Sequence, residues 1–298
     1  MKRPLCFRLL KAGAAPAIAF LFLCIGGLLV FLLVKGVPAL GQELFFGETP
    51  PLEAILGRQP VWDGLWPALA GSLCLVGIAL CLALFPGVGC GVWLAEYASP
   101  KVKSAAGAAI DVLAGTPSIV MGLFGFTLII FLRHTFMPQA NTCLLLAAGC
   151  LALLVLPVLI VSTKEALEAV PRDLKLTAMA LGFSKERRIR HVQLPAAASG
   201  ILSGVILALG RCAEDTAVIM LTGAVANAGL PAGLLAKFEA LPFHIFYFTA
   251  EYQNQAELTR AFGAALVLLA LAGGLILLAG CLAARYRRRR REGALWRA

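Results

Sequence analysis

Residues 142–163 read TCLLLAAGCLALLVLPVLIVST, an apolar run without a charged side chain. A helix that crosses the hydrocarbon core of a membrane needs about 20 mostly apolar residues, so this run is long enough to span. The whole chain has the same character, because 60% of its 298 residues are apolar and 14% are charged. Soluble domains have roughly 45–50% and about 25%. The sequence therefore predicts an integral membrane protein and excludes most classes of soluble enzyme.

Five further runs of the same kind bring the number of expected transmembrane helices to six. They cover Ala14–Val34, Leu65–Leu94, Val112–Leu132, Ala196–Thr222 and Ala261–Ala284. The first run is longer than the apolar part of a signal peptide and lacks a small-residue cleavage site after it, so we interpret it as a retained helix. The predicted fold class is an all-α membrane protein.

Basic residues are distributed unevenly between the two sides of this arrangement. Of 26 Lys and Arg residues, 20 lie in the two terminal tails and in the connections after the second and fourth runs, and five lie in the other connections. Because basic loops stay in the cytoplasm, both termini are expected there. The arginine-rich tail 285–298 is expected to lie against anionic membrane lipid, and no nucleic-acid binding is expected.

The motifs of nucleotide-hydrolysing and metal-dependent enzymes are missing from the sequence. It contains no G-x-x-x-x-G-K-[ST] loop, its three histidines have no ligand-like spacing, and its nine cysteines include no C-x-x-C pair. We therefore expect this chain to have no ATPase site of its own, to bind no cofactor and to hold no metal.

The basic connection 164–195 carries clear local signals. Pro171 suits the first turn of a short helix, where its missing N–H costs nothing. Residues at helical spacing then form one apolar face, made by Leu174, Ala178 and Leu181. A short amphipathic helix of this kind either lies on the lipid surface or docks on a cytoplasmic partner.

Three further signals follow that helix. Gly182 suits a left-handed C-terminal cap, and Ser184 suits the N-cap of a second, basic piece. Leu194 and Pro195 then open the fifth membrane helix. These fixed ends predict a rigid projection from the membrane.

This connection resembles the signature loop of the membrane subunits of ABC importers. That signature is Glu-Ala-Ala, three residues, Gly, nine residues, Ile, one residue and Leu-Pro. The positions that match it here are Ala178, Gly182, Val192, Leu194 and Pro195. Leu176 stands in place of the Glu and Thr177 in place of the first Ala. The resemblance implies that residues 164–195, hereafter the coupling loop, seat in a partner ATPase that uses ATP.

Three other blocks resemble the phosphate permease subunits of that family. They are Val92–Tyr97, Gly115–Gly125 and Gly204–Ala217. The last departs from the usual Arg-x-x-Gly-Glu-Thr-Ala-Pro, because Glu214, Asp215 and Val218 replace its Gly, Glu and Pro. The resemblance implies a type I permease fold in a bacterial inner membrane.

The same resemblance implies a division of the chain and a set of partners. Residues 1–64 would hold the N-terminal tail, the first helix and the first periplasmic loop, 65–284 the five-helix permease core, and 285–298 a basic cytoplasmic tail. The partners implied are a homologous permease subunit, two cytoplasmic ATPase subunits and a periplasmic phosphate-binding protein.

Three ionisable residues lie inside the fifth apolar run: Arg211, Glu214 and Asp215. Each costs about 2.5–3.5 kcal/mol to insert, which makes an intramembrane charge a functional candidate. At a rise of about 1.5 Å per residue, Arg211 lies about 22 Å from Ala196. Either acid, three or four residues on, can neutralise it. Two interpretations stay open: an ion pair that helps a charged helix insert, or an arginine that lines the pathway and binds an anion, for which its planar fork suits phosphate.

The other polar and small residues of these blocks allow either a structural or a functional interpretation. Thr116 and Ser118 flank a proline and either face the pathway or simply open the third helix. In the charged block, Glu214, Asp215 and Thr216 are candidates for the pathway together with Arg211. The glycines are expected mainly to let helices approach closely. They are Gly87, Gly89, Gly91, Gly122 and Gly125.

The sequence thus predicts the transmembrane subunit of an ATP-driven phosphate importer, which forms half of the translocation pathway. One alternative is a permease for another oxyanion such as molybdate, tungstate or sulfate. A second is an ion-coupled secondary carrier or channel with Arg211 and Asp215 as its charge relay, against which the missing inverted repeat counts. A third is a membrane sensor subunit that does not transport.

Overall fold

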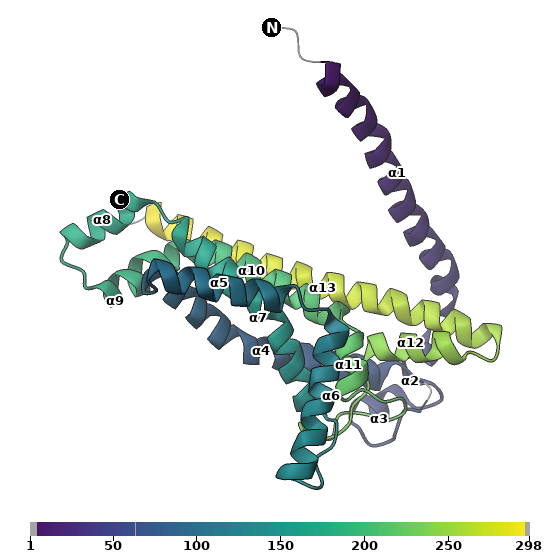
Figure 1. Cartoon of the computed structure of the whole chain (residues 1–298). Helices are drawn as coiled ribbons and strands as arrows, with labels where there is room; N and C mark the ends of the chain where they lie inside the picture. The colour runs from purple at the N-terminus through teal and green to yellow at the C-terminus, as the bar shows by residue number, and fades with distance from the viewer. Residues whose placement is uncertain (1–4, 63, 296–298) are drawn as a thin grey trace.

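The computed structural model describes residues 5–62 and 64–295 (Figure 1). The predicted all-α fold is confirmed, since these residues form helices and their only β pairing is an isolated bridge between Ala224 and Phe238. The elements are α1 (Leu5–Gly36), the 3-10 turn η1 (Val37–Ala39), α2 (Gln42–Phe46), α3 (Pro51–Ile55), α4 (Trp66–Glu96), α5 (Pro100–Ala114), α6 (Ser118–Thr135), α7 (Leu144–Glu168), α8 (Arg172–Ala180), α9 (Lys185–Arg188), the π-helical turn η2 (Ile189–Gln193), α10 (Leu194–Glu214), α11 (Ala217–Thr222), α12 (Leu241–Glu251) and α13 (Gln255–Leu295).

Six helical segments of the described chain are long and apolar enough to cross a membrane, as the sequence predicts. They are Pro16–Ala39, Trp66–Glu96, Ser118–Thr135, Leu144–Glu168, Lys185–Glu214 and Gln255–Tyr286. Several predicted basic residues of the two tails, Lys2, Arg3 and Arg297, lie outside the described residues.

Helices α4, α7 and α10 form the centre of the bundle, and α4 and α7 are the most extensively packed pair. Glycines make this close approach possible. A Cβ atom on Gly87 would lie 2.7 Å from the Cβ of Leu159, and one on Gly91 would lie 2.6 Å from the Cβ of Thr163. The predicted packing role is confirmed at these two positions, whereas Gly89 faces open space.

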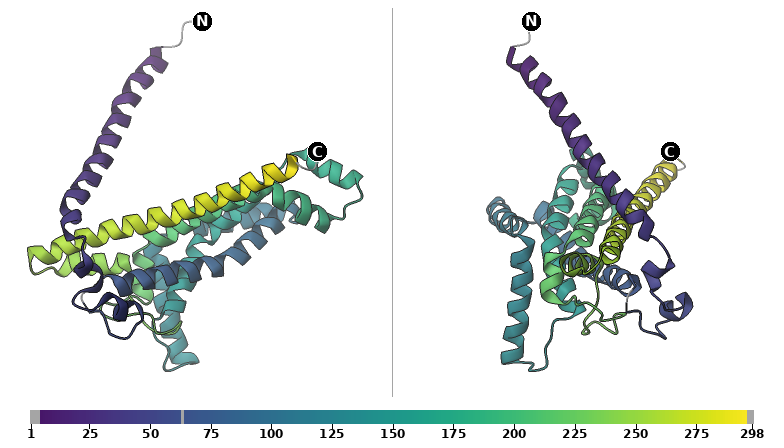
Figure 2. Two further views of the ribbon diagram at one scale, coloured as in Figure 1. Left: turned by 180° about the vertical axis from the view of Figure 1, so that it is seen from behind. Right: turned by 90° about the vertical axis from the view of Figure 1, so that its right-hand side faces the viewer.

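Helix α1 leaves this bundle at a wide angle (Figures 1 and 2). Its main contacts are with α13 and η1 at its C-terminal end, where the rings of Phe31 and Phe262 meet edge to face at 5.6 Å. Most of its large apolar side chains are exposed. In a membrane protein such a face is covered by lipid or by another subunit.

The third span begins later than predicted. Val112 was expected to open it, but Val112 belongs to α5, and α6 begins at Ser118. The break falls at Thr116 and Pro117. A proline disfavours helical backbone at the residue before it and lacks the N–H that a continuing helix needs, so two helices replace one.

The fifth span, expected to run unbroken from Ala196 to Thr222, is interrupted at Asp215. That residue has extended backbone with φ −74° and ψ 123°, and its Oδ1 accepts the N–H of Val218 at 2.8 Å. An aspartate that bonds backbone three residues on favours a helix start over a helix interior. The apolar run therefore divides into α10 and α11.

The loop 223–240 folds back over one end of the bundle. The backbone N–H groups of Cys143, Leu144 and Leu145 donate to carbonyl oxygens of Thr222, Ala236 and Leu234, at 3.1, 3.0 and 2.8 Å respectively. These bonds satisfy donors at the start of α7 that have no partner within the helix.

Candidate functional site

The coupling loop forms the tip of the molecule. Helices α8 and α9 project beyond α4 and α10, beside the C-terminal end of α13 (Figures 1 and 2). This arrangement agrees with the predicted projection from the membrane.

Local backbone signals explain the shape of this tip. Gly182 has φ +76°, its N–H donates to the oxygen of Met179 at 2.9 Å, and the N–H of Phe183 donates to that of Ala178 at 3.1 Å. This is the left-handed cap predicted from the glycine. Ser184 Oγ accepts the N–H of Arg187 at 3.4 Å and caps α9, also as predicted.

Two details of the tip differ from the sequence prediction. Pro171 is the N-cap residue of α8 and precedes its first turn. The predicted apolar face of α8 is also divided, because Ala178 is buried whereas Leu174 and Leu181 are exposed. The exposed large apolar side chains here are Leu174, Leu176 and Met179 of α8 and Leu181, which directly follows it.

The entry into the fifth span is continuous. Helix α9 passes through the π-helical turn η2 directly into α10, which begins at Leu194 with Pro195 in its first turn. Because a proline donates no hydrogen bond and crowds the preceding turn, a wider turn before it relieves the conflict. The turn buries Ile189 and Gln193.

A cluster of charged side chains, which the sequence reasoning did not single out, lies under this tip. The Glu96 carboxylate at the end of α4 is 2.9 Å from Lys175 Nζ of α8 and 3.8 Å from Arg188 Nη2 of α9. Glu96 belongs to the block Val92–Tyr97, but its partners lie more than 70 residues away in the chain. The only available signal was the acid itself at the end of an apolar run.

The three charges of the fifth span are arranged differently. Arg211 and Glu214 are exposed in this single chain, and Asp215 is buried. Within the described residues, Arg211 forms no ion pair with either acid. The break at Asp215 ends the helical spacing that would bring its carboxylate beside Arg211. The first interpretation, a self-contained ion pair, is therefore not what the structure contains.

Two broken helices pack side by side near these charges. Helix α11 lies along α6, and a Cβ on Gly122 would lie 2.9 Å from the carbonyl oxygen of Ala217, while one on Gly125 would lie 2.6 Å from Thr222 Cγ2. The predicted packing role of both glycines is confirmed. Because the earlier glycine of α6 meets the start of α11 and the later one meets its end, the two helices run parallel. The breaks before α6 and before α11 therefore lie at the same end of the pair.

The remaining predicted pathway residues lie at those two breaks. The half-buried Thr116 donates its hydroxyl to the carbonyl oxygen of Val112 at 3.0 Å. Ser118 is the first residue of α6, and the carbonyl oxygen of Thr216 accepts the N–H of Met220 in the first turn of α11. The structure thus brings Thr116, Ser118 and Thr216 to one region.

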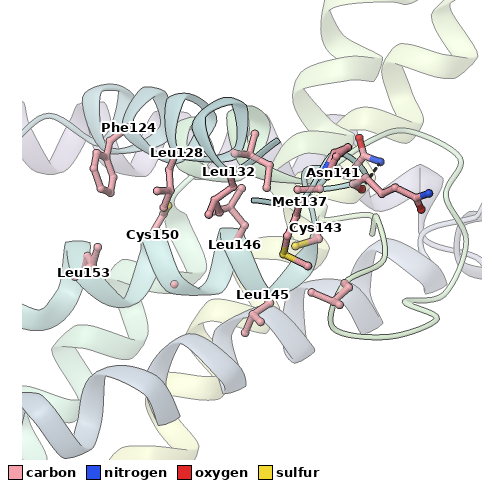
Figure 3. Close-up of a pocket in the computed structure, with 16 residues that line it drawn as sticks. Phe124, Leu128, Leu132, Met137, Asn141, Cys143, Leu145, Leu146, Cys150 and Leu153 are labelled. Atoms are coloured by element: carbon pink, nitrogen blue, oxygen red, sulfur yellow. Dashed lines mark hydrogen bonds between the residues drawn. The ribbon is translucent and has the colours of Figure 1, made fainter. Parts of the chain in front are cut away.

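A separate, apolar groove of about 780 Å³ lies between α6 and α7 (Figure 3). Phe124, Leu128 and Leu132 line it from α6, and Leu146 and Leu153 from α7. None of the lining residues of this groove is charged. Arg211, the basic residue inside the fifth span, is not among them.

Residues 87–292 match a protein family described as "Binding-protein-dependent transport system inner membrane component". The match covers more than half of the sequence, and the chain belongs to this family of multi-pass inner-membrane permeases. Membership implies a permease partner and ATPase subunits.

Individual proteins similar to this chain include phosphate permease subunits and a solved ABC transporter. The chain is 35% identical to the phosphate transport system permease protein PstA of Yersinia pestis over 74% of this chain and 72% of that protein. It is 33% identical to PstA 1 of Mycobacterium tuberculosis strain H37Rv over 82% and 77%. A bacterial ABC transporter involved in the import of the acidic polysaccharide alginate shares the fold, with a TM-score of 0.66 at 13% identity over 93% of this chain and 95% of that chain.

Proposed function

We propose that this chain is the transmembrane subunit of an ATP-driven importer of inorganic phosphate and forms half of its translocation pathway. The names of its PstA relatives, each similar over most of both chains, support this substrate. The structural observation that carries the proposal is the exposed guanidinium of Arg211, which has no ion-pair partner among the described residues.

An unpaired arginine in an apolar span is unfavourable unless an anion or a polar path meets it. Its planar fork matches two oxygens of phosphate and stays charged at any working pH. Asp215 is buried and bonded to backbone, so that of the two acids in this block Glu214 is the exposed one. Basic groups from the homologous permease subunit would supply the further positive charge that an anion needs. Thr116, Ser118 and Thr216 would line the same path.

The coupling loop would transmit the energy. With both termini in the cytoplasm, α8 places its exposed apolar side chains where a cytoplasmic ATPase subunit can bind them. The motif residues Leu174, Ala178, Leu181, Gly182, Leu194 and Pro195 would form or shape that contact. ATP would be used by the two ATPase subunits, while this chain binds no cofactor, and a periplasmic phosphate-binding protein would deliver the substrate outside.

The first experiment is uptake of labelled phosphate at low micromolar concentration by cells that lack the chain. Complementation with wild type should restore uptake, whereas Arg211→Gln should not. The matched control is Arg58→Gln, which removes an exposed arginine of a loop and should leave uptake unchanged. If Arg211→Gln supports uptake as well as wild type, the proposed role of this arginine is wrong.

A panel of oxyanions identifies the substrate. Phosphate should compete with labelled phosphate, whereas sulfate, molybdate and tungstate should not. If wild type restores no phosphate uptake but accumulates one of the other anions, the phosphate assignment fails and the permease assignment stands.

A further inference from the structure

Glu96 is nearly enclosed at the tip end of α4. Its side chain is 9% exposed, although it carries a charge. Oε1 lies 2.9 Å from Lys175 Nζ of α8, and Oε2 lies 3.8 Å from Arg188 Nη2 of α9. One carboxylate therefore joins two consecutive helices of the coupling loop to α4.

The π-helical turn supplies a third contact. Gln193 is fully buried, and in the amide orientation that satisfies both of its polar atoms, its nitrogen donates to Glu96 Oε1 at 2.9 Å. Its oxygen then accepts from Arg188 Nε at 3.2 Å. Tyr97, which follows Glu96 in the chain, makes a further contact. Lys185 Nζ of α9 lies 4.2 Å from the centroid of its ring, a distance typical of a cation–π contact. Glu96 and Tyr97 thus contact α8, α9 and η2.

We propose that Glu96 is the positioning residue that fixes the coupling loop to α4, so that a displacement of α8 moves α4 together with α10. The inference rests on the proposed function, because it needs an ATPase that moves α8. It adds a specific transmission contact inside the permease.

Connectivity explains why this contact is needed. The loop reaches α10 through covalent continuity, since α9, η2 and α10 form one helical run. It has no such link to α4, and most of the large apolar side chains of α8 are exposed. Because Gln193 immediately precedes α10, its bond to Glu96 ties the start of α10 to the end of α4.

Helix α4 is also able to pass a displacement on. It is locked against α7 by the close contacts at Gly87 and Gly91. At the base of the coupling loop, Leu167 and Val170 form a small buried cluster with Ala197 and with side chains of α4 and α10. Side chains in such dense packing move as a unit, so a pull on Glu96 is transmitted to the bundle.

The contact depends on the charge of Glu96. Removing the carboxylate leaves Lys175 and Arg188 close together without their shared counter-charge, and breaking one partner of an enclosed ion pair is strongly unfavourable. The neutral variant Glu96→Gln keeps the size of the side chain and removes only the charge. It therefore tests the charge contact and preserves the packing.

The experiment measures phosphate transported per ATP hydrolysed by the complete transporter in proteoliposomes, with its partner permease, ATPase subunits and binding protein. Glu96→Gln should lower this ratio by about tenfold, within the range of coupling between two sites, while the ATPase subunits still co-purify. The control is Glu48→Gln, which removes the charge of an exposed acid in a loop outside the coupling loop and should keep the wild-type ratio.

Lys175→Met tests the same contact from α8 and guards against a folding defect of the first variant. It should lower the ratio, and the double variant should be no worse than Glu96→Gln alone, because both changes remove one interaction. A wild-type ratio in Lys175→Met, or strictly additive effects, would overturn the inference. Failure of the proposed function would appear differently, as no phosphate transport by the wild-type transporter.

Discussion

Two charged clusters of this chain differ in how their charges are paired. At the tip, Glu96 is surrounded by Lys175, Arg188 and Gln193, so that its carboxylate is paired with two bases. In the fifth span, Arg211 and Glu214 are exposed and the third charged residue, Asp215, bonds to backbone. Paired charges hold elements together, whereas an unpaired charge is free to bind a ligand or a partner.

The difference has a simple geometric origin. Glu96 receives side chains from elements that fold back onto the end of α4, so its pairing is long-range. Arg211 and Asp215 lie four residues apart, which in an unbroken helix would bring them together. The helix ends between them, and the carboxylate caps α11 instead.

The largest effect is expected from removing the tip. Deletion of Arg172–Gly182 should abolish both ATPase association and transport, because it removes α8 with its exposed apolar side chains and its cap. Co-purification of the ATPase subunits with the permease pair measures this directly. Retained association after the deletion would contradict the docking role of α8.

Substitutions at Asp215 distinguish a carboxylate that caps α11 from one that serves as the counter-ion of Arg211. Asparagine caps a helix about as well as aspartate, so Asp215→Asn should retain most phosphate uptake. Asp215→Ala should lower the stability of the purified permease by about 0.5–2 kcal/mol, the usual cost of a lost N-cap. Thermal unfolding in detergent and uptake are the two measurements. Equal loss of uptake in both variants would instead indicate that the charge of Asp215 matters.

Glu239 tests what burial does to an acid that has no ion-pair partner among the described residues. Glu239 lies in the loop 223–240, and its Oε1 accepts the N–H of Gly229 at 2.7 Å. Burial raises the pKa of Glu239 from 4.5 to about 7, despite the backbone hydrogen bonds from Gly229 and Ala228. The folded state then binds the proton more tightly than the unfolded state, so stability should fall as pH rises between 4.5 and about 7. Glu239→Gln should flatten this part of the thermal unfolding profile against pH, and an unchanged slope would contradict it.

The smallest effect is expected at Ser184. Its contact with Arg187 N–H is long, at 3.4 Å, and α9 has only four residues. Ser184→Ala should therefore reduce transport by about twofold, since a cap of this kind is worth about 0.5 kcal/mol at the low end of the range. Uptake assays decide this, and a loss as large as that of the tip deletion would mean that α9 orientation is more critical than its contacts indicate.

The sequence predicted what depends on neighbours in the chain. The six spans follow from apolar length, and the caps at Gly182 and Ser184 follow from local backbone preferences. The start of α10 at Leu194 follows in the same way.

The sequence did not predict what depends on distant partners or on competing local bonds. The break at Asp215 lies inside an apolar run. It arises because the Asp215 carboxylate accepts the backbone N–H of Val218 and forms no ion pair with Arg211. The Glu96 cluster needs residues from α8 and η2 to meet the end of α4, and no periodicity encodes that meeting. The wide angle of α1 is also a property of packing, since its sequence indicates only a span.

The most direct test of whether Arg211 binds the anion compares a single and a double charge substitution in the fifth span. Phosphate uptake is measured for Arg211→Gln and for the double variant Arg211→Gln with Asp215→Asn, at equal amounts of membrane protein. If Arg211 meets the translocated anion, the double variant stays as inactive as the single one. Recovery of uptake in the double variant would show that Arg211 serves only to neutralise Asp215, and would contradict the account.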